Sequence, residues 1–147
     1  MVTRRSAKSK GSQWEMDSEY SLKALYPNIR RLGGEGQYRQ IDLIDDVEEV
    51  AVECKRHHKF SWNELKGYLD KLEDRKPEGY MGFLVFREDR QPAKVMTYVN
   101  NVAMVALFED LFVVPFVKHK STRRKPKVVL QGSQTASSLD TRVRRKK

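Results

Sequence analysis

The helix start at Ser61 is the feature of this sequence that most constrains its fold. The Ser61 side chain can accept a hydrogen bond from the backbone of Glu64 while the Glu64 side chain reaches back, which is the capping-box pattern. The apolar residues that follow recur at the spacing of one helix face: Leu65, Tyr68, Leu69 and Leu72. On either side, residues 48–55 and 80–86 have the apolar pattern of strands. The chain is therefore predicted to pack helices on a β-sheet.

The other segments extend this combination of helices and strands along the chain. The further predicted elements are a helix at residues 13–26, strands at 28–32, 38–44 and 93–99, a final helix from Asn100 or Asn101 to Leu111, and an extended piece at 112–118. A glycine-rich loop at 33–37 and an acidic turn at Asp45–Asp46 separate the early strands. This order predicts an α/β domain with a mixed central sheet flanked by helices.

Charge is distributed unevenly along the 147 residues, whose total net charge is +9. Residues 1–12 hold four basic residues and residues 119–147 hold ten against Asp140 alone, whereas residues 13–118 carry a net charge of −4. We expect a flexible basic arm, a folded domain over 13–118 and a disordered basic tail. Basic tails around an acidic centre indicate a polyanion partner, most often nucleic acid. The alternative is that the tails only improve solubility.

Composition also bounds the cellular setting. The single cysteine, Cys54, excludes an intrachain disulfide and fits a reducing compartment. No apolar run approaches the roughly 20 residues of a membrane span, and the basic N-terminus lacks the apolar region of a secretory signal. We expect a soluble intracellular protein of the cytoplasm or nucleoid with no membrane partner. In a eukaryotic cell, the basic tail could serve as a nuclear signal.

The predicted hairpin carries the residues with the clearest chemistry. Side chains alternate along a strand, so Glu53 and Lys55 should share one face while Cys54 points to the other. On the partner strand Asp42 lies between Ile41 and Leu43 and should face opposite to both. The three charged groups then converge at one end of the sheet, where two carboxylates suit a hard divalent cation such as Mg²⁺. Such a cation polarises a phosphate and activates water, and a nearby ammonium stabilises the developing charge.

These residues resemble a known family. Asp42, followed eleven residues later by Glu53-Cys54-Lys55, is similar to the signature of the PD-(D/E)xK nuclease superfamily. The sequence "GSQWE", with Gly11 and Glu15, resembles the opening of the first helix in archaeal Holliday junction resolvases and related restriction-type nucleases. The sequence "FSWNELKGYLDKL" resembles the helix that follows the catalytic strand in that group.

The resemblance spans roughly residues 11–115 and implies a restriction-endonuclease-like fold with Mg²⁺-dependent cleavage of DNA. Mn²⁺ would be the substitute ion, and DNA recombination the setting. Asp42 and Glu53 would be the metal carboxylates, the Cys54 carbonyl a further ligand and Lys55 the catalytic lysine. Glu15 would be the helix carboxylate, with Glu19 as a competing candidate. The nominal proline before the aspartate is absent from this chain.

A basic rim is predicted beside this site. The residues expected to contact DNA phosphates are Arg39, Arg56, His57, His58 and Lys59. A plain solvated loop is an equal alternative for the segment after the strand. One cysteine and three histidines in the whole chain make a structural zinc site a poor alternative. The resemblance also implies a two-fold dimer, for which Val102, Val105 and Phe108 of the predicted last helix could supply an apolar face.

Three functions remain open at this point. The first is a Holliday-junction-resolvase-like DNA endonuclease. The second is a restriction- or repair-type nuclease that uses the same site on duplex or single-stranded DNA. The third is a nuclease-fold protein that binds DNA without cutting it, in which the charged residues of the hairpin form only surface ion pairs.

Overall fold

The computed structural model describes residues 4–32 and 41–119, and for residues 4–10 it describes the backbone alone. Several predictions from the sequence lie outside these residues. They are the glycine-rich loop at 33–37, the first part of the hairpin strand at 38–40 with Arg39, and the basic tail from residue 120 onward.

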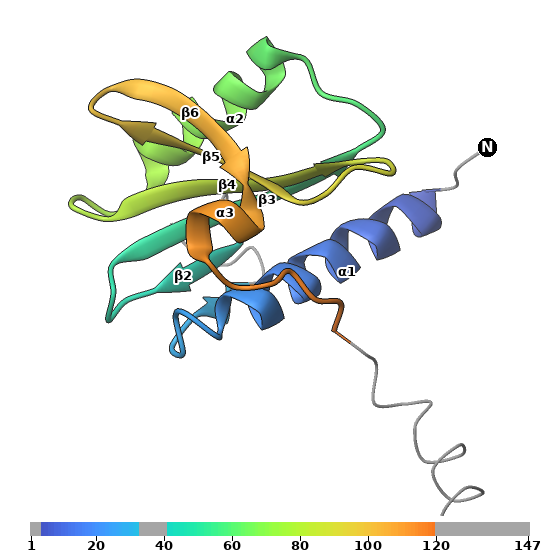
Figure 1. The fold of residues 1–147 in the computed structure, drawn as a ribbon, viewed down its shortest axis with the longest axis horizontal. Coiled ribbons are helices and arrows are strands. Elements are labelled where there is room, and N and C mark those ends of the chain that lie inside the picture. Colours follow the sequence, from blue (N-terminus) through green and yellow to red (C-terminus); the bar gives the residue numbers. More distant parts are fainter. Residues whose placement is uncertain (1–3, 33–40, 120–147) are drawn as a thin grey trace, which may run out of the picture.

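The described strands form one mixed sheet, which confirms the predicted fold class (Figure 1). The strands are β1 (Arg30–Arg31), β2 (Leu43–Asp45), β3 (Val50–His57), β4 (Met81–Glu88), β5 (Lys94–Val99) and β6 (Val102–Leu107). They lie side by side in chain order. Strands β3 and β4 are parallel and every other neighbouring pair is antiparallel. The helix α2 (Trp62–Arg75) makes the crossover that a parallel pair requires.

Helices cover both faces of the sheet. On one face, α1 (Arg4–Leu22) and the short α3 (Phe108–Phe112) pack on β3 and β4 through an apolar core that includes Trp14, Val52 and Phe112. On the other face, the leucines of α2 pack on Ala51 and Leu84. A sheet covered on both faces must be apolar on both faces, which explains the unbroken apolar run at the centre of β4.

The capping box predicted at Ser61 is present at the start of α2. The Ser61 hydroxyl accepts a hydrogen bond from the Glu64 N–H at 3.1 Å, and the Glu64 carboxylate accepts one from the Ser61 N–H at 3.3 Å. Three residues of the predicted apolar face, Leu65, Leu69 and Leu72, are buried. The local signal therefore set both the start of the helix and the side that it turns to the sheet.

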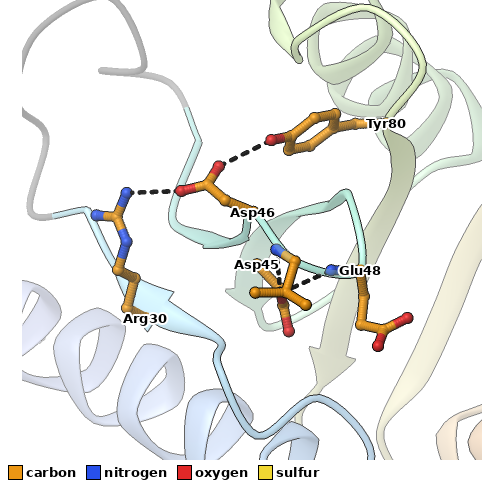
Figure 2. A network of polar contacts seen from close by, with 6 residues as sticks. Arg30, Asp45, Asp46, Glu48 and Tyr80 are labelled. Carbon is orange, nitrogen blue, oxygen red and sulfur yellow. Dashed lines mark hydrogen bonds and ion pairs between the residues drawn. The ribbon is translucent and has the colours of Figure 1, made fainter.

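The acidic turn between β2 and β3 is held by its own carboxylates (Figure 2). The buried Asp45 accepts hydrogen bonds from the N–H groups of Val47 and Glu48, both at 2.9 Å. Asp46 accepts from Arg30 at 3.1 Å and from the Tyr80 hydroxyl at 2.9 Å. These two hydrogen bonds lower the pKa of Asp46, that of Tyr80 being the larger cause. The turn thereby connects β2 to β3, the strands beside Asp42 and Glu53.

Two predictions about helices were wrong. The helix α1 begins at Arg4 and ends at Leu22, so residues 4–12 continue the helix in place of the predicted flexible arm. Helical hydrogen bonds are local, and Arg, Ala and Lys are favourable helix formers, so a polar segment can extend a helix that is anchored further on. Residues 102–107 form the edge strand β6, where a final helix was predicted. Asn100 and Asn101 both have positive φ, 50° and 66°, as a two-residue hairpin turn requires.

The correction at β6 also removes the predicted helical dimer face. Val102 and Val105 are exposed on β6, whereas Phe108 is buried in α3. The segment that follows α3 has no regular secondary structure and runs back along α1 (Figure 1). Phe116 stacks on Trp14 with ring centroids 4.7 Å apart, and the Val117 N–H donates to the Ser21 hydroxyl at 2.9 Å.

Candidate active site

Asp42 is held at a bend immediately before β2. Its N–H donates to the Val52 carbonyl and its carbonyl accepts from the Leu32 N–H, both at 3.0 Å. Its Oδ2 atom accepts a hydrogen bond from the Cys54 N–H at 2.7 Å. The backbone of Leu32 and that of β3 thus fix the aspartate, and its carboxylate accepts a β3 hydrogen bond that a backbone carbonyl of the neighbouring strand would otherwise accept.

The strict alternation predicted around Asp42 does not hold. Leu43 is part of the core on the α1 side of the sheet, whereas Ile41 is part of the core on the α2 side. Asp42 therefore cannot lie opposite to both. The reason is that β2 begins only at Leu43, so the backbone before it is free of the strand pleat.

Glu53 and Lys55 share one face of β3, as the strand period predicts. The Glu53 Oε1 and Lys55 Nζ atoms are 3.1 Å apart, and the lysine Nζ lies 4.7 Å from the centre of the Tyr68 ring on α2. Cys54 points to the opposite face and is buried in the core under α1. Burial raises the pKa of its thiol, so Cys54 is a packing residue whose backbone, not its sulfur, belongs to the site.

The helix carboxylate that approaches this hairpin is Glu15. Its Oε2 atom forms an ion pair with Arg31 of β1 at 2.9 Å, and its charge acts on both Asp42 and Glu53. Glu19, the competing candidate, lies one turn further along α1 and faces Lys23 at 3.9 Å. The structure thus brings Glu15, Asp42, Glu53 and Lys55 together and leaves Glu19 outside the group.

The pKa values of these groups record how closely they lie. The pKa of Asp42 is raised from 3.8 to about 7, first by burial and then by the negative charges of Glu53 and Glu15. The pKa of Glu53 is also raised by burial, although Lys55 opposes the shift. Burial works to lower the pKa of Lys55, but Glu53 and Asp42 outweigh it and raise the pKa. A buried carboxylate that lies among other carboxylates favours a bound proton or a cation.

The donor set of this cluster suits a hard divalent cation, because two carboxylates and a backbone carbonyl are oxygen ligands. Each acid also has a partner within the chain: Asp42 the Cys54 N–H, Glu53 Lys55, and Glu15 Arg31. Across residues 4–32 and 41–119, no group of three or more His, Cys, Asp and Glu side chains is arranged to hold a metal ion. A metal here would therefore have to displace at least one of these partners.

The predicted basic rim is only partly brought to this site. Arg56 and His57 end β3, and His57 stacks on Phe60 with ring centroids 4.7 Å apart. His58 is 3.1 Å from an oxygen of Asp89, and Lys59 is exposed. Arg39 lies outside the described residues. The described residues of the rim therefore follow Lys55 at the end of β3 and in the two residues after it.

Arg31 is the residue of this site that sequence reasoning missed. It ends β1, and it supplies the positive charge that faces the helix carboxylate. The adjacent Arg30 turns instead to Asp46 on the acidic turn (Figure 2). The only signal in the sequence is the Arg30-Arg31 pair, and strand alternation separates two neighbours without saying which one meets an acid.

Comparisons with known proteins add one distant likeness. No family model matches the chain, and neither does any curated protein. Among solved structures, the chain is similar to Archaeoglobus fulgidus Hjc, described as a Holliday junction resolvase from an archaeal hyperthermophile. The two are 14% identical, the alignment covers 76% of this chain and 99% of that chain, and the TM-score is 0.37. A TM-score of this size does not establish a common fold, so the proposals below rest on this chain's own residues.

One finding bears on membranes. None of the helices within the described residues is both long enough and apolar enough to cross a bilayer.

Proposed function

We propose that this chain is a metal-dependent DNA endonuclease of the PD-(D/E)xK type, with a branched DNA such as a Holliday junction as its substrate. The observation that carries the proposal is the meeting of Glu15, Asp42, Glu53 and Lys55, which come from a helix, a bend and a strand. Burial, and then the negative charges of Glu53 and Glu15, raise the pKa of Asp42 to about 7. A surface ion pair has no need of a second and a third carboxylate, whereas a cation site does.

In this proposal Asp42, Glu53 and the Cys54 carbonyl would hold Mg²⁺, with Mn²⁺ as a substitute. The ion would polarise the scissile phosphate and lower the pKa of a water molecule near it. Asp42 must lose its proton before it can serve as a ligand, and Glu53 must part from Lys55. Both changes are favoured by a positive charge placed between the two carboxylates.

The chain's own residues would complete the chemistry. Lys55 lies on the same face as Glu53, so once released it can donate a hydrogen bond to the negative charge that develops on the phosphate. Its contact with the Tyr68 ring holds the ammonium close to the strand. Glu15, held by Arg31, would orient the attacking water or a second shell of waters.

The partners proposed are DNA and a second copy of the chain. The basic residues at both ends would bind DNA backbone in a salt-dependent way, and Arg56, His57, His58 and Lys59 would extend that contact beside the site. A two-fold dimer would place two such sites on one DNA molecule, as cleavage of paired strands requires. Such a protein would work in the cytoplasm or nucleoid.

Cleavage of labelled DNA tests this function directly. Four-way junction, duplex and single-stranded DNA would be incubated with Mg²⁺, with Mn²⁺ and with EDTA. We expect metal-dependent cutting that falls by about a hundredfold or more in Asp42→Ala and in Lys55→Ala. Glu48→Gln, an exposed acid on the neighbouring turn, is the matched control and should cut at the wild-type rate. The preferred DNA distinguishes a resolvase from a restriction- or repair-type nuclease.

A second candidate function is DNA binding without cleavage. The observation in its favour is that Asp42, Glu53 and Glu15 all have partners within the chain, so the cluster is stable without a metal. Binding of all three DNAs with no cutting under either metal would select this function and overturn the endonuclease.

A further inference from the structure

A cavity lies between α1 and the segment that follows α3, beside Arg31. Its volume is about 190 Å³. It is lined by Met16, Glu19, Tyr20, Lys23, Arg31 and His119. None of these residues was assigned a role at the cavity from the sequence. Only Arg31 also belongs to the candidate active site, where it faces Glu15.

The wall that carries His119 is fixed to α1 by hydrogen bonds. The His119 N–H donates to the Asp17 carboxylate at 2.9 Å, and the His119 carbonyl accepts from the Gln13 side chain at 3.4 Å. Two residues before His119, the Val117 N–H donates to the Ser21 hydroxyl at 2.9 Å. The cavity is therefore lined by α1 with Lys23 just after it, by Arg31 of β1, and by His119, which these hydrogen bonds hold against α1.

The lining is suited to an anion. Lys23 and Arg31 are cations, and Glu19 is the acid among the lining residues. The Lys23–Glu19 pair spans 3.9 Å and Lys23 is half-exposed, so the ammonium can change partner at small cost. The Nδ1 atom of His119 is buried and has no hydrogen-bond partner among the described residues. A buried imidazole nitrogen without a partner is unfavourable unless a ligand or water supplies one.

We propose that this cavity binds a phosphate group, and that the phosphate belongs to the backbone of the nucleic acid that enters the candidate active site. The second part rests on the proposed function, whereas the first stands on the cavity alone. Lys23, Arg31 and His119 would hold the phosphate oxygens, and the Tyr20 ring, 5.3 Å from the His119 ring, would close one side. Arginine is well suited to such a shared position because it presents several donors in one plane.

The shared arginine links this cavity to the candidate active site. Arg31 now uses one of its nitrogens on Glu15 at 2.9 Å. A phosphate bound in the cavity competes for the same guanidinium, so the negative charge of Glu15 beside Asp42 and Glu53 is less fully compensated. A bound phosphate would thus raise the affinity of the carboxylate cluster for a cation when DNA is bound.

Side-chain NMR of histidine tests the proposal without cleavage. The chain has three histidines, so imidazole signals are few and those of His119 can be followed separately. The full chain in EDTA would be titrated with inorganic phosphate and, separately, with a short single-stranded DNA, both at constant ionic strength. We expect the His119 signals to shift with both ligands. The DNA should produce the shift at a lower concentration of phosphate groups than inorganic phosphate does.

Lys23→Met supplies the variant, because it keeps the length of the side chain and removes the charge. The loss of one charged hydrogen bond predicts an affinity lower by about tenfold or more for either ligand. Lys118→Met, an exposed lysine next to His119 that does not line the cavity, is the matched control and should bind like wild type. Thermal unfolding of both variants would show that the fold is intact.

Each result decides the proposal. Shifts at His119 that weaken in Lys23→Met and not in Lys118→Met support it. Shifts with inorganic phosphate and none with DNA support the anion site and overturn its assignment to nucleic acid. No shift at His119 with either ligand overturns both parts. Because no metal or cleavage is involved, a chain that binds phosphate here and cuts no DNA would sink the proposed endonuclease alone.

Discussion

Asp42 is the residue on which pH should act most clearly, because its pKa is raised from 3.8 to about 7. Between these two values the folded chain holds a proton that the unfolded chain has lost, so the free energy of unfolding should fall as pH rises through that window. Asp42→Asn removes the titration. We expect the stability of wild type relative to Asp42→Asn to decline from pH 3.8 to about 7 and then level off, as measured by urea unfolding.

Asp46→Asn provides a control of opposite sign, because a lowered pKa gives stability that is lost as pH falls. A flat difference for Asp42→Asn would contradict the crowding of carboxylates around it.

At the scale of the elements, α2 packs closely on β4 at Gly82, which has no side chain to hold the helix and the strand apart. A Cβ atom at Gly82 would lie 2.9 Å from the Glu73 carboxylate and 3.3 Å from the Leu72 side chain. Gly82→Ala should therefore destabilise the fold by about 1 kcal/mol, since the Glu73 carboxylate can move aside but the Leu72 and Lys76 side chains must also give way. The same substitution at Gly67, within α2, meets nothing within 4 Å and should stabilise by about 1 kcal/mol through helix propensity. Urea unfolding of the two variants measures both effects. Equal stability of Gly82→Ala and wild type would show that the layers can separate without cost.

At the scale of the whole molecule, we propose that a second copy of the chain would pair with the edge strand β6. All six residues of Val102–Leu107 are uncharged, and the larger side chains among them are exposed. An edge strand without charge or proline leaves its backbone open to pairing with another chain. Met104→Lys should therefore convert a dimer to a monomer in sedimentation experiments, because a charged side chain on an edge strand opposes its pairing with another chain. Val47→Lys, at an exposed apolar residue on the β2–β3 turn, should leave the mass unchanged. A monomeric wild type would contradict the proposed assembly.

Predictions from the sequence succeeded where the physical cause is local. The Ser61 capping box and the apolar face of α2 depend on contacts within one helix, and both are present. The shared face of Glu53 and Lys55 follows from the strand period, and these two side chains meet. Prediction failed at residues 102–107, where an unbroken apolar run carries no period that separates strand from helix. There the positive φ angles of Asn100 and Asn101, stabilised by pairing with β5, decided the structure.

The candidate site also has features that follow from local causes and features that depend on tertiary contacts. By itself, the sequence determined which chemical groups are available and which of them share a strand, because alternation and capping act between neighbours in the chain. Only the tertiary structure decided that Glu15 and not Glu19 approaches Asp42, that Arg31 meets Glu15, and that His119 returns to α1. Those contacts join residues that the chain separates widely. Their formation depends on how α1 packs on the sheet, which is set by burial of residues such as Trp14 and Leu22 and not by any local pattern.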